Sequence, residues 1–246
     1  MRRQAGIALA AVAASSLLLT TGCGGHSGSK ADKPSASAGK SSAAAKQAAS
    51  GEKAALTRKQ LESAAIKSSD VATYEVTVPK SASGPIGGEH MVADKPACQP
   101  VADALSATAG AVKPVAAVER SAVAKNLSGV MVRVRLASYA DGDADKVMSA
   151  LSSAATTCKG FTGSVGTDKQ HVAVADYDGY LTAQGSVTLR LTTKFGKQTL
   201  PVYLDVGTVG TTVEYFATFN VTGEDPTVGP TEVETPQTVK LTTAGH

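Results

Sequence analysis

The sequence contains no tryptophan and few large aromatic rings. Its 246 residues include 4 Phe and 6 Tyr, so the core must be built mainly from valine, leucine and alanine. Valine and threonine dominate the second half of the chain, a composition typical of β-strands. The formal net charge is only +3, the lysines gather near the N-terminus, and no basic stripe alternates with aromatic residues. These features argue against a nucleic-acid-binding protein.

Catalytic and metal-binding constellations are also missing. The chain has no Gly-x-Ser-x-Gly turn and no glycine-rich phosphate loop. Only His90 and His171 are candidates for a folded site, and they stand apart, whereas a zinc site needs several close ligands. Asp176 and Asp178 have a spacing that paired glycosidase carboxylates can adopt, but Asp178 precedes a glycine and is typical of a turn. We therefore expect no enzyme activity, no catalytic residue, no metal and no cofactor.

The acidic run 141–145 resembles the start of a calcium loop, because oxygen-bearing side chains recur at every second position. A calcium loop of this kind also needs glycine at its sixth position and glutamate at its twelfth, where this chain has Lys146 and Ser152. The run therefore predicts an acidic N-cap for a helix over residues 144–158.

The longest apolar run is too short to cross a bilayer comfortably. It covers about 15 residues, from Ala5 to Leu19, and follows Arg2 and Arg3. A positive start followed by an apolar stretch of this length predicts an export signal over residues 1–22. The two arginines raise the alternative of a twin-arginine signal, but the Phe-Leu-Lys-like continuation is absent, which favours the general secretory route.

The signal ends in Leu-Thr-Thr-Gly-Cys at residues 19–23, which we interpret as the lipobox of a bacterial lipoprotein. A diacylglycerol group on the thiol of Cys23, with an acyl chain on its amino group, supplies the two anchors that stable membrane binding needs. Thr20 stands where such motifs usually carry leucine, and the alternative is an ordinary cleaved signal. The interpretation places the exported protein at the outer face of the cytoplasmic membrane, anchored by Cys23.

Residues 23–53 are rich in glycine, serine, alanine and lysine and contain no large apolar side chain. Such a segment cannot bury a core, so we expect a disordered tether with a reach of about 30 Å. Its lysines suit contact with anionic lipid or wall polymer, although a merely soluble spacer is the favoured alternative. Residues 54–246 are then expected to form a single domain.

Cysteine is used three times. With Cys23 assigned to the lipid, Cys98 and Cys158 remain as an even pair in an exported protein, which predicts one disulfide. Closing a loop of about 60 residues stabilises the fold by roughly 4 kcal/mol in the chain-entropy treatment.

Hydrophobic periodicity predicts an α+β fold. Short connections between successive strands favour antiparallel pairing, and the sum is a twisted antiparallel sheet of about six to seven strands with three helices packed on it. The expected helices cover 56–66, with Thr57 as its N-cap, 96–105 and 144–158, and a polar, partly helical tail ends near Leu241. The expected strands cover 74–78, 115–123, 130–136, 171–175, 185–195, 200–206 and 211–222. In the strand 185–195, Val187, Leu189 and Leu191 are expected to form one buried face, and Thr188, Arg190 and Thr192 the other.

Several local expectations accompany this fold. Arg133 and Arg135 are expected on a solvent-facing side of their strand. Val147 and Ala150 are expected to face inward from the third helix, and Gly160 to end that helix as its C′ residue. A turn is expected over residues 207–210.

Four features occur in order along the chain. They are a short helix that begins near Cys98, a strand that ends in Arg-Leu-Ala-Ser-Tyr at 135–139, a helix that ends in Cys-Lys-Gly-Phe at 158–161, and closing hairpins with Val-Glu-Tyr-Phe-Ala at 213–217. This pattern resembles the actinobacterial lipoproteins related to the extracellular sensor domain of PknH-type serine/threonine kinases, over about residues 56–241. The resemblance implies a sensor-like, ligand-binding fold with a cleft between sheet and helices. Those kinase domains carry two disulfides, whereas this chain offers one pair.

The function expected from these features is binding of a small molecule or cell-envelope component by a membrane-anchored domain. No kinase half accompanies the domain, so signalling would need a membrane protein partner. The alternative is a non-catalytic protein-docking or envelope-assembly module without a small ligand. A deep, apolar-lined cavity favours the first, and a flat, exposed apolar patch favours the second. The few aromatic rings are interpreted as core fillers, with a pocket lining as the alternative; they are Tyr139, Tyr177, Tyr180, Tyr203, Tyr215 and Phe216.

Overall fold

The computed structural model describes residues 54–80, 89–108, 110–126, 128–179, 185–195, 197–226 and 231–244. The expected signal segment, Cys23 and the tether lie outside these ranges, as does Tyr180. No helix within the described ranges is long and apolar enough to cross a membrane.

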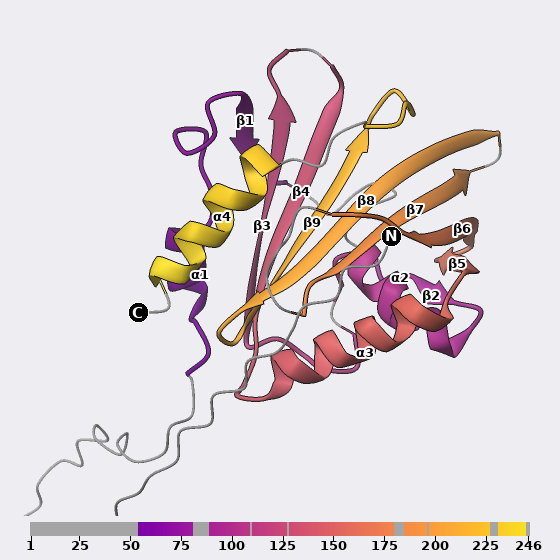
Figure 1. Cartoon of the computed structure of the whole chain (residues 1–246), viewed down its shortest axis with the longest axis horizontal. Coiled ribbons are helices and arrows are strands. Elements are labelled where there is room, and N and C mark those ends of the chain that lie inside the picture. The colour runs from indigo at the N-terminus through magenta and orange to yellow at the C-terminus, as the bar shows by residue number, and fades with distance from the viewer. Residues whose placement is uncertain are drawn as a thin grey trace, which may run out of the picture. The chain divides into compact units, whose positions relative to one another are not determined.

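The fold is built on one antiparallel sheet, with helices on both of its faces (Figure 1). The strand order across the sheet is β1-β3-β4-β9-β8-β7-β6-β5-β2. The strands are β1 (Tyr74–Thr77), β2 (Val92–Ala93), β3 (Ala116–Ala124), β4 (Val130–Ser138), β5 (Gly160–Val165), β6 (Asp168–Asp176), β7 (Val187–Phe195), β8 (Gln198–Val209) and β9 (Thr212–Asn220). The helices are α1 (Arg58–Ala64), the single turn η1 (Pro96–Cys98), α2 (Gln99–Leu105), α3 (Asp143–Thr157) and α4 (Thr231–Ala244).

The antiparallel sheet is confirmed, but it has nine strands and four α-helices in the described residues rather than six to seven and three. The sequence did not predict β2 or β5. Strand β2 has only two residues, and β5 begins at Gly160, the residue expected to end a helix. The polar tail is a full helix, α4, although it contains Pro236. The expected turn at 207–210 is also wrong in part, because β8 continues to Val209 and the chain reverses at Gly210, whose φ is +60°.

Two hydrophobic cores lie on opposite faces of the sheet. Successive side chains of a strand point to opposite faces, and on β9 Tyr215 and Ala217 belong to the core beneath α2 and α3, whereas Phe216 belongs to the core beneath α1 and α4. We call these the disulfide face and the α4 face. Figure 1 shows α1 and α4 side by side over β3, apart from α2 and α3.

The disulfide between Cys98 and Cys158 is present, as predicted. It joins η1 to the residue that ends α3, with the two Cα atoms 5.2 Å apart. Both cysteines are 2% exposed. The bridge therefore fixes two helix ends on the same face of the sheet.

Helix α1 begins as predicted and ends earlier than predicted. The Thr57 side chain accepts from the backbone N–H of Gln60, and the Gln60 side chain accepts from the backbone N–H of Thr57, which is a reciprocal capping box. The helix ends at Ala64 because Gln237 of α4 takes over its hydrogen bonds. The Gln237 amide accepts from Ile66 N–H at 2.9 Å and donates to the Ala64 carbonyl at 3.1 Å.

Helix α3 departs from expectation at both ends. Its N-cap is Gly142 with φ +74°, and no side chain caps the helix, so the predicted acidic N-cap is wrong. Asp143 and Asp145 lie in the first turn instead, where their negative charge is favourable. At the other end Cys158, not Gly160, terminates the helix.

The solvent-facing placement of Arg133 and Arg135 is also wrong. Their side chains are only 11% and 13% exposed, and both form ion pairs with Glu119, at 3.2 Å and 3.0 Å. Arg133 and Arg135 pair in register with Ala217 and Tyr215 of β9, so they point to the disulfide face, which α2 and α3 cover. Arg135 also donates to the carbonyl of Ala107, just beyond α2.

Candidate functional site

A cleft opens between α2 and α3 on the disulfide face, which we call the α2–α3 cleft. Its volume is about 240 Å³. Tyr139 and Tyr215 form its floor, and Val147, Ala150 and Leu151 of α3 form one wall. Val147 is half-buried and packs against the core, as predicted, whereas Ala150 is exposed and does not pack inward; both line the cleft. The opposite wall comes from η1, α2 and the segment after α2: Pro96, Gln99, Pro100, Asp103, Ala104, Thr108, Gly110, Ala111 and Val112.

The floor offers two uncharged hydroxyl groups. The hydroxyl oxygens of Tyr139 and Tyr215 lie 3.4 Å apart, and the two residues are 2% and 8% exposed. Burial raises the pKa of Tyr215 well above its usual value, with a further contribution from the Tyr139 hydroxyl. Both rings are held by the sheet, because Tyr215 lies in β9 and Tyr139 directly follows β4. Both rings belong to the buried core, as expected, and they also line the cleft, which was the alternative.

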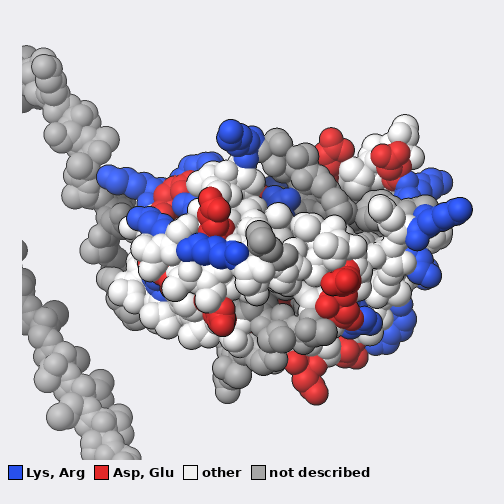
Figure 2. All heavy atoms as spheres, turned by 90° about the horizontal axis from the view of Figure 1, so that it is seen from above, with Lys and Arg blue, Asp and Glu red and all other residues white. Residues whose placement is uncertain are grey.

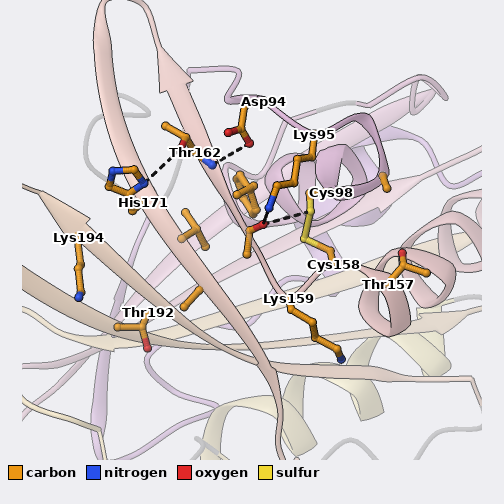
Figure 3. Close-up of a pocket in the computed structure, with 15 residues that line it drawn as sticks. Asp94, Lys95, Cys98, Thr157, Cys158, Lys159, Thr162, His171, Thr192 and Lys194 are labelled. Carbon is orange, nitrogen blue, oxygen red and sulfur yellow. Dashed lines mark hydrogen bonds between the residues drawn. A yellow bond between two sulfur atoms is a disulfide. The ribbon is translucent and has the colours of Figure 1, made fainter.

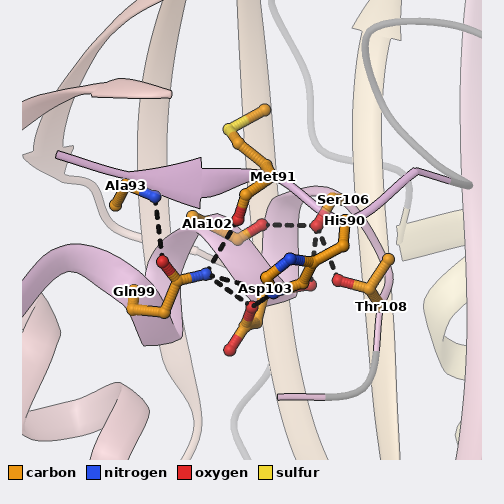
Figure 4. A network of polar contacts seen from close by, with 8 residues as sticks. All are labelled: His90, Met91, Ala93, Gln99, Ala102, Asp103, Ser106 and Thr108. Carbon is orange, nitrogen blue, oxygen red and sulfur yellow. Dashed lines mark hydrogen bonds and ion pairs between the residues drawn. The ribbon is translucent and has the colours of Figure 1, made fainter. Parts of the chain in front are cut away.

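The α2 wall carries a polar network centred on Asp103 (Figure 4). Gln99 Nε2 donates to Asp103 Oδ1 at 2.8 Å, and His90 Nε2 lies 3.1 Å from the same oxygen. Gln99 also accepts from Ala93 N–H and donates to the Met91 carbonyl, which fastens β2 to α2. His90, one of the two histidines considered for a folded site, is 51% exposed at its side chain and contacts Asp103.

The far side of Asp103 is approached closely by the backbone of Gly110. A Cβ atom at position 110 would lie 2.5 Å from Asp103 Oδ2, so only glycine fits there without movement of the carboxylate. Across the cleft on α3, Lys146 is 69% exposed at its side chain and pairs with Asp143. The cleft thus has an apolar body, a neutral hydroxyl floor and one carboxylate at its wall, a composition that suits non-covalent binding of a small molecule.

No group of three or more histidine, cysteine, aspartate or glutamate side chains within the described ranges has the geometry of a metal site. The Asp176 side chain is 76% exposed beside Lys159, and Tyr177, which lies between Asp176 and Asp178 in the sequence, donates a hydrogen bond to Asp205. His171 contacts Thr162 through Nδ1 at 3.2 Å on the surface of β6.

Sequence reasoning missed a cluster of buried carboxyl groups beneath α4. Asp205 of β8 and Glu214 of β9 are 0% exposed and Glu234 of α4 is 2% exposed. The Thr238 hydroxyl donates to Glu214 at 2.8 Å, and the Tyr177 hydroxyl donates to Asp205. The remaining oxygens of all three carboxyl groups accept no hydrogen bond within the described part of the chain.

Burial raises the pKa of all three acids. It raises the pKa of Glu214 to about 7, and burial together with the nearby charges of Asp205 and Glu214 raises the pKa of Glu234 to about 9. Burial also raises the pKa of Asp205, against the hydrogen bond from Tyr177. The nearby charge of Asp205 favours a protonated Glu234, because two carboxyl groups in one buried site do not both ionise at low cost. The alternation on β8 and β9 does place these residues on one face, but sequence alone did not show that α4 covers them.

No family model matches the sequence, and no curated protein matches it. Among solved structures, the extracellular domain of PknH from Mycobacterium tuberculosis aligns with a TM-score of 0.54 at 10% identity, over 78% of this chain and 98% of that chain. A Mycobacterium smegmatis protein described as an Rv0999 ortholog aligns with a TM-score of 0.34 at 14% identity, over 70% of this chain and 87% of that chain. At this level of identity the first likeness shows the fold. The chain therefore has the fold of the PknH extracellular domain, as the resemblance implied.

Proposed function

We propose that this chain is an exported, lipid-anchored protein whose sensor-like domain binds a small molecule in the α2–α3 cleft. The observation that carries the proposal is the cleft itself: about 240 Å³, with an apolar body and convergent polar groups from Tyr139, Tyr215 and Asp103. A ligand that fits this chemistry is mainly apolar, with a hydroxyl or amine that reaches the floor or the carboxylate. The fold shared with an extracellular domain supports function outside the cytoplasm.

The docking alternative has less support in the described residues. Their exposed large apolar side chains are six valines at separate places in the fold, not a continuous surface on one element. A protein-docking patch would need contiguous apolar area. The valines are Val78, Val92, Val115, Val123, Val221 and Val239.

Native mass spectrometry of the purified full chain tests the cleft. We expect a co-purified small molecule on the wild type and its loss in Ala150→Trp, which fills the mouth of the cleft from an exposed helix position. Ser149→Trp is the matched control, because it adds the same ring to the neighbouring exposed position of α3, outside the cleft lining. An unliganded wild type, or equal ligand on wild type and Ala150→Trp, would contradict the proposal.

The anchor is proposed on the sequence alone. It has residues 1–22 as the signal peptide, Cys23 as the lipidated residue, 23–53 as the tether and 54–246 as the domain. Growth with radiolabelled fatty acid tests it: Cys23→Ala should carry no label and leave the membrane fraction. Labelling of Cys23→Ala as strong as that of the wild type would reject the lipobox.

A further inference from the structure

A second hollow lies beside the disulfide, away from the α2–α3 cleft. Its volume is about 580 Å³. It is bounded by the loop before η1, the end of α3 and the strands β5, β6 and β7 (Figure 3). The hollow makes no use of Tyr139, Tyr215 or Asp103, so it stands independently of the proposed cleft.

Small side chains in register create this hollow. Gly160 of β5 pairs with Ala173 of β6, and Ala173 pairs with Thr192 of β7, so three small residues lie side by side across the sheet. A residue with a side chain does not fit at position 160 without movement, because its Cβ would lie 2.9 Å from the carbonyl oxygen of Val172. These three small residues in register therefore leave a depression in this face of the sheet.

The sheet face around the hollow is basic. The β5–β7 residues that share this face are Gly160, Thr162 and Ser164; Lys169, His171, Ala173 and Ala175; and Arg190, Thr192 and Lys194. None of them is acidic. Figure 2 shows lysine and arginine side chains gathered at the end of the molecule where β5 and β6 lie in Figure 1, with a few acidic side chains between them.

Three lysines approach the hollow from different elements. Lys95 precedes η1 and donates to the Gly160 carbonyl at 2.7 Å, which fixes its ammonium group at the edge of β5 without neutralising it. Lys159 follows α3, and its exposed ion pair with Asp176 is long, at 3.8 Å. Lys194 projects from β7 and forms no ion pair with any residue that the structure describes.

Among the residues that the structure describes, Asp94 is the one acid in the lining of the hollow. It accepts from Thr162 N–H at 2.9 Å, so part of its charge is engaged in closing the edge of β5. Three lysines against Asp94 and the exposed Asp176 leave the hollow with net positive charge. Cations around a concave surface concentrate the field and attract anions.

We infer that this hollow, the lysine hollow, binds a ligand that carries two or more phosphate groups. A single phosphate is far smaller than the hollow and cannot reach lysines from three directions, whereas linked phosphates can contact Lys95, Lys159 and Lys194 together. Ammonium groups on flexible stems bind phosphate as point charges, without the fixed geometry that arginine imposes. The lysine hollow is a second site, separate from the small-molecule cleft.

Isothermal titration of the full chain with sodium tripolyphosphate tests this site. We expect saturable binding at about 50 mM salt that weakens strongly at about 500 mM. Ala173→Leu fills the floor without changing charge and should lower the affinity at least about tenfold. Lys194→Gln should lower it by about the same factor, the effect of one lost charge-assisted contact.

The matched controls lie outside the lining of the hollow. Ala175→Leu adds the same side chain two residues along the same exposed face, and Lys197→Gln removes a lysine just past β7; both should bind as the wild type does. Absence of binding by the wild type, or equal losses in Ala173→Leu and Ala175→Leu, would overturn the site. If Ala173→Leu unfolds, Lys194→Gln against Lys197→Gln decides the question alone.

A parallel titration identifies the source of the phosphate. Glycerophosphoglycerol, the soluble headgroup of an anionic phospholipid, carries one phosphodiester and should bind more weakly than tripolyphosphate. That order supports a free or polymeric phosphate ligand. Tighter binding of glycerophosphoglycerol would overturn the requirement for two phosphates.

Discussion

The two faces of the sheet share apolar cores but differ in what else holds their helices. On the disulfide face, a covalent bridge accompanies the core that fixes η1, α2 and α3, and Asp103 in the cleft wall is hydrogen-bonded. On the α4 face, buried polar groups accompany the core: Gln237 caps α1, and three buried carboxyl groups lie beneath α4.

This difference predicts that the stability of one face is independent of pH and that the stability of the other depends on it. A disulfide and apolar packing do not change with pH, whereas carboxyl groups that are buried without cations are favourable only while they hold protons. The face with the candidate binding cleft is therefore the one with fixed geometry, and the α4 face is the one whose stability depends on pH.

Removal of the disulfide should have the largest effect. Cys98→Ser combined with Cys158→Ser is expected to lower the free energy of unfolding by about 4 kcal/mol, because the loop between them is no longer closed in the unfolded chain. Guanidinium unfolding measures the loss. Hydrogen exchange should show faster exchange in α2 and α3 than in α4; equal loosening of both faces would contradict the division between them.

Raising the pH should weaken the α4 face next. The pKa values of Glu214 and Glu234 are higher in the folded chain than in the unfolded chain, so folding is most stable while both acids are protonated, below about pH 4.5. The free energy of unfolding then falls as the pH rises through about 7 for Glu214 and about 9 for Glu234. At about 1.4 kcal/mol per pKa unit, Glu214 alone should lower the free energy of unfolding by about 3 kcal/mol between pH 5 and pH 9.

Urea unfolding across this pH range, with two variants, checks the assignment. Glu234→Gln removes one buried acid and should flatten the pH dependence. Glu232→Gln, two residues earlier and exposed, should keep the slope of the wild type. A wild-type stability that does not fall between pH 5 and pH 9 would be incompatible with buried, protonated acids.

Truncation of Gln237 should have an intermediate effect. Gln237→Ala leaves Ile66 N–H and the Ala64 carbonyl without partners in a buried position and is expected to lower the free energy of unfolding by about 2 kcal/mol. Thr235→Ala, at an exposed position of α4, should change it by less than about 0.5 kcal/mol. Equal effects of the two substitutions would show that Gln237 does not link α4 to α1.

Loss of the α1 cap should have the smallest effect. Thr57→Ala removes the capping box with Gln60 and should lower the free energy of unfolding by about 1 kcal/mol. Ser63→Ala, on an exposed side of the same helix, should leave it unchanged or raise it slightly. The prediction fails if thermal unfolding places both variants at the wild-type midpoint.

Local signals in the sequence predicted much of the framework. Thr57 marked the start of α1, the alternation of Val187, Leu189 and Leu191 marked one buried face of β7, and the even pair Cys98 and Cys158 predicted the bridge. The cap and the alternation depend only on residues close together in the sequence, and the disulfide prediction depends only on the number of cysteines. The same kind of reasoning missed β2 and β5, which are short or contain glycine. It predicted α4 only as a partly helical tail, because that segment contains a proline.

The candidate sites depended on contacts between distant segments. Val147 and Ala150 have the helical spacing of core residues, and only the position of α2 leaves them at the edge of a cleft. Arg133 and Arg135 alternate as solvent-facing residues would, and only the packing of helices on that face of the sheet buries them beside Glu119.

By itself, the sequence determined the antiparallel strand pattern, the helix start at Thr57 and the available cysteine pair, since periodicity, capping and composition act locally. The tertiary structure alone decided that Asp205, Glu214 and Glu234 meet beneath α4, and that Gly160, Ala173 and Thr192 align into a hollow ringed by lysines. The physical reason is the same in both cases. Strand register and helix docking bring together residues far apart in the chain, and the charge, burial and pKa of a side chain are set by those neighbours.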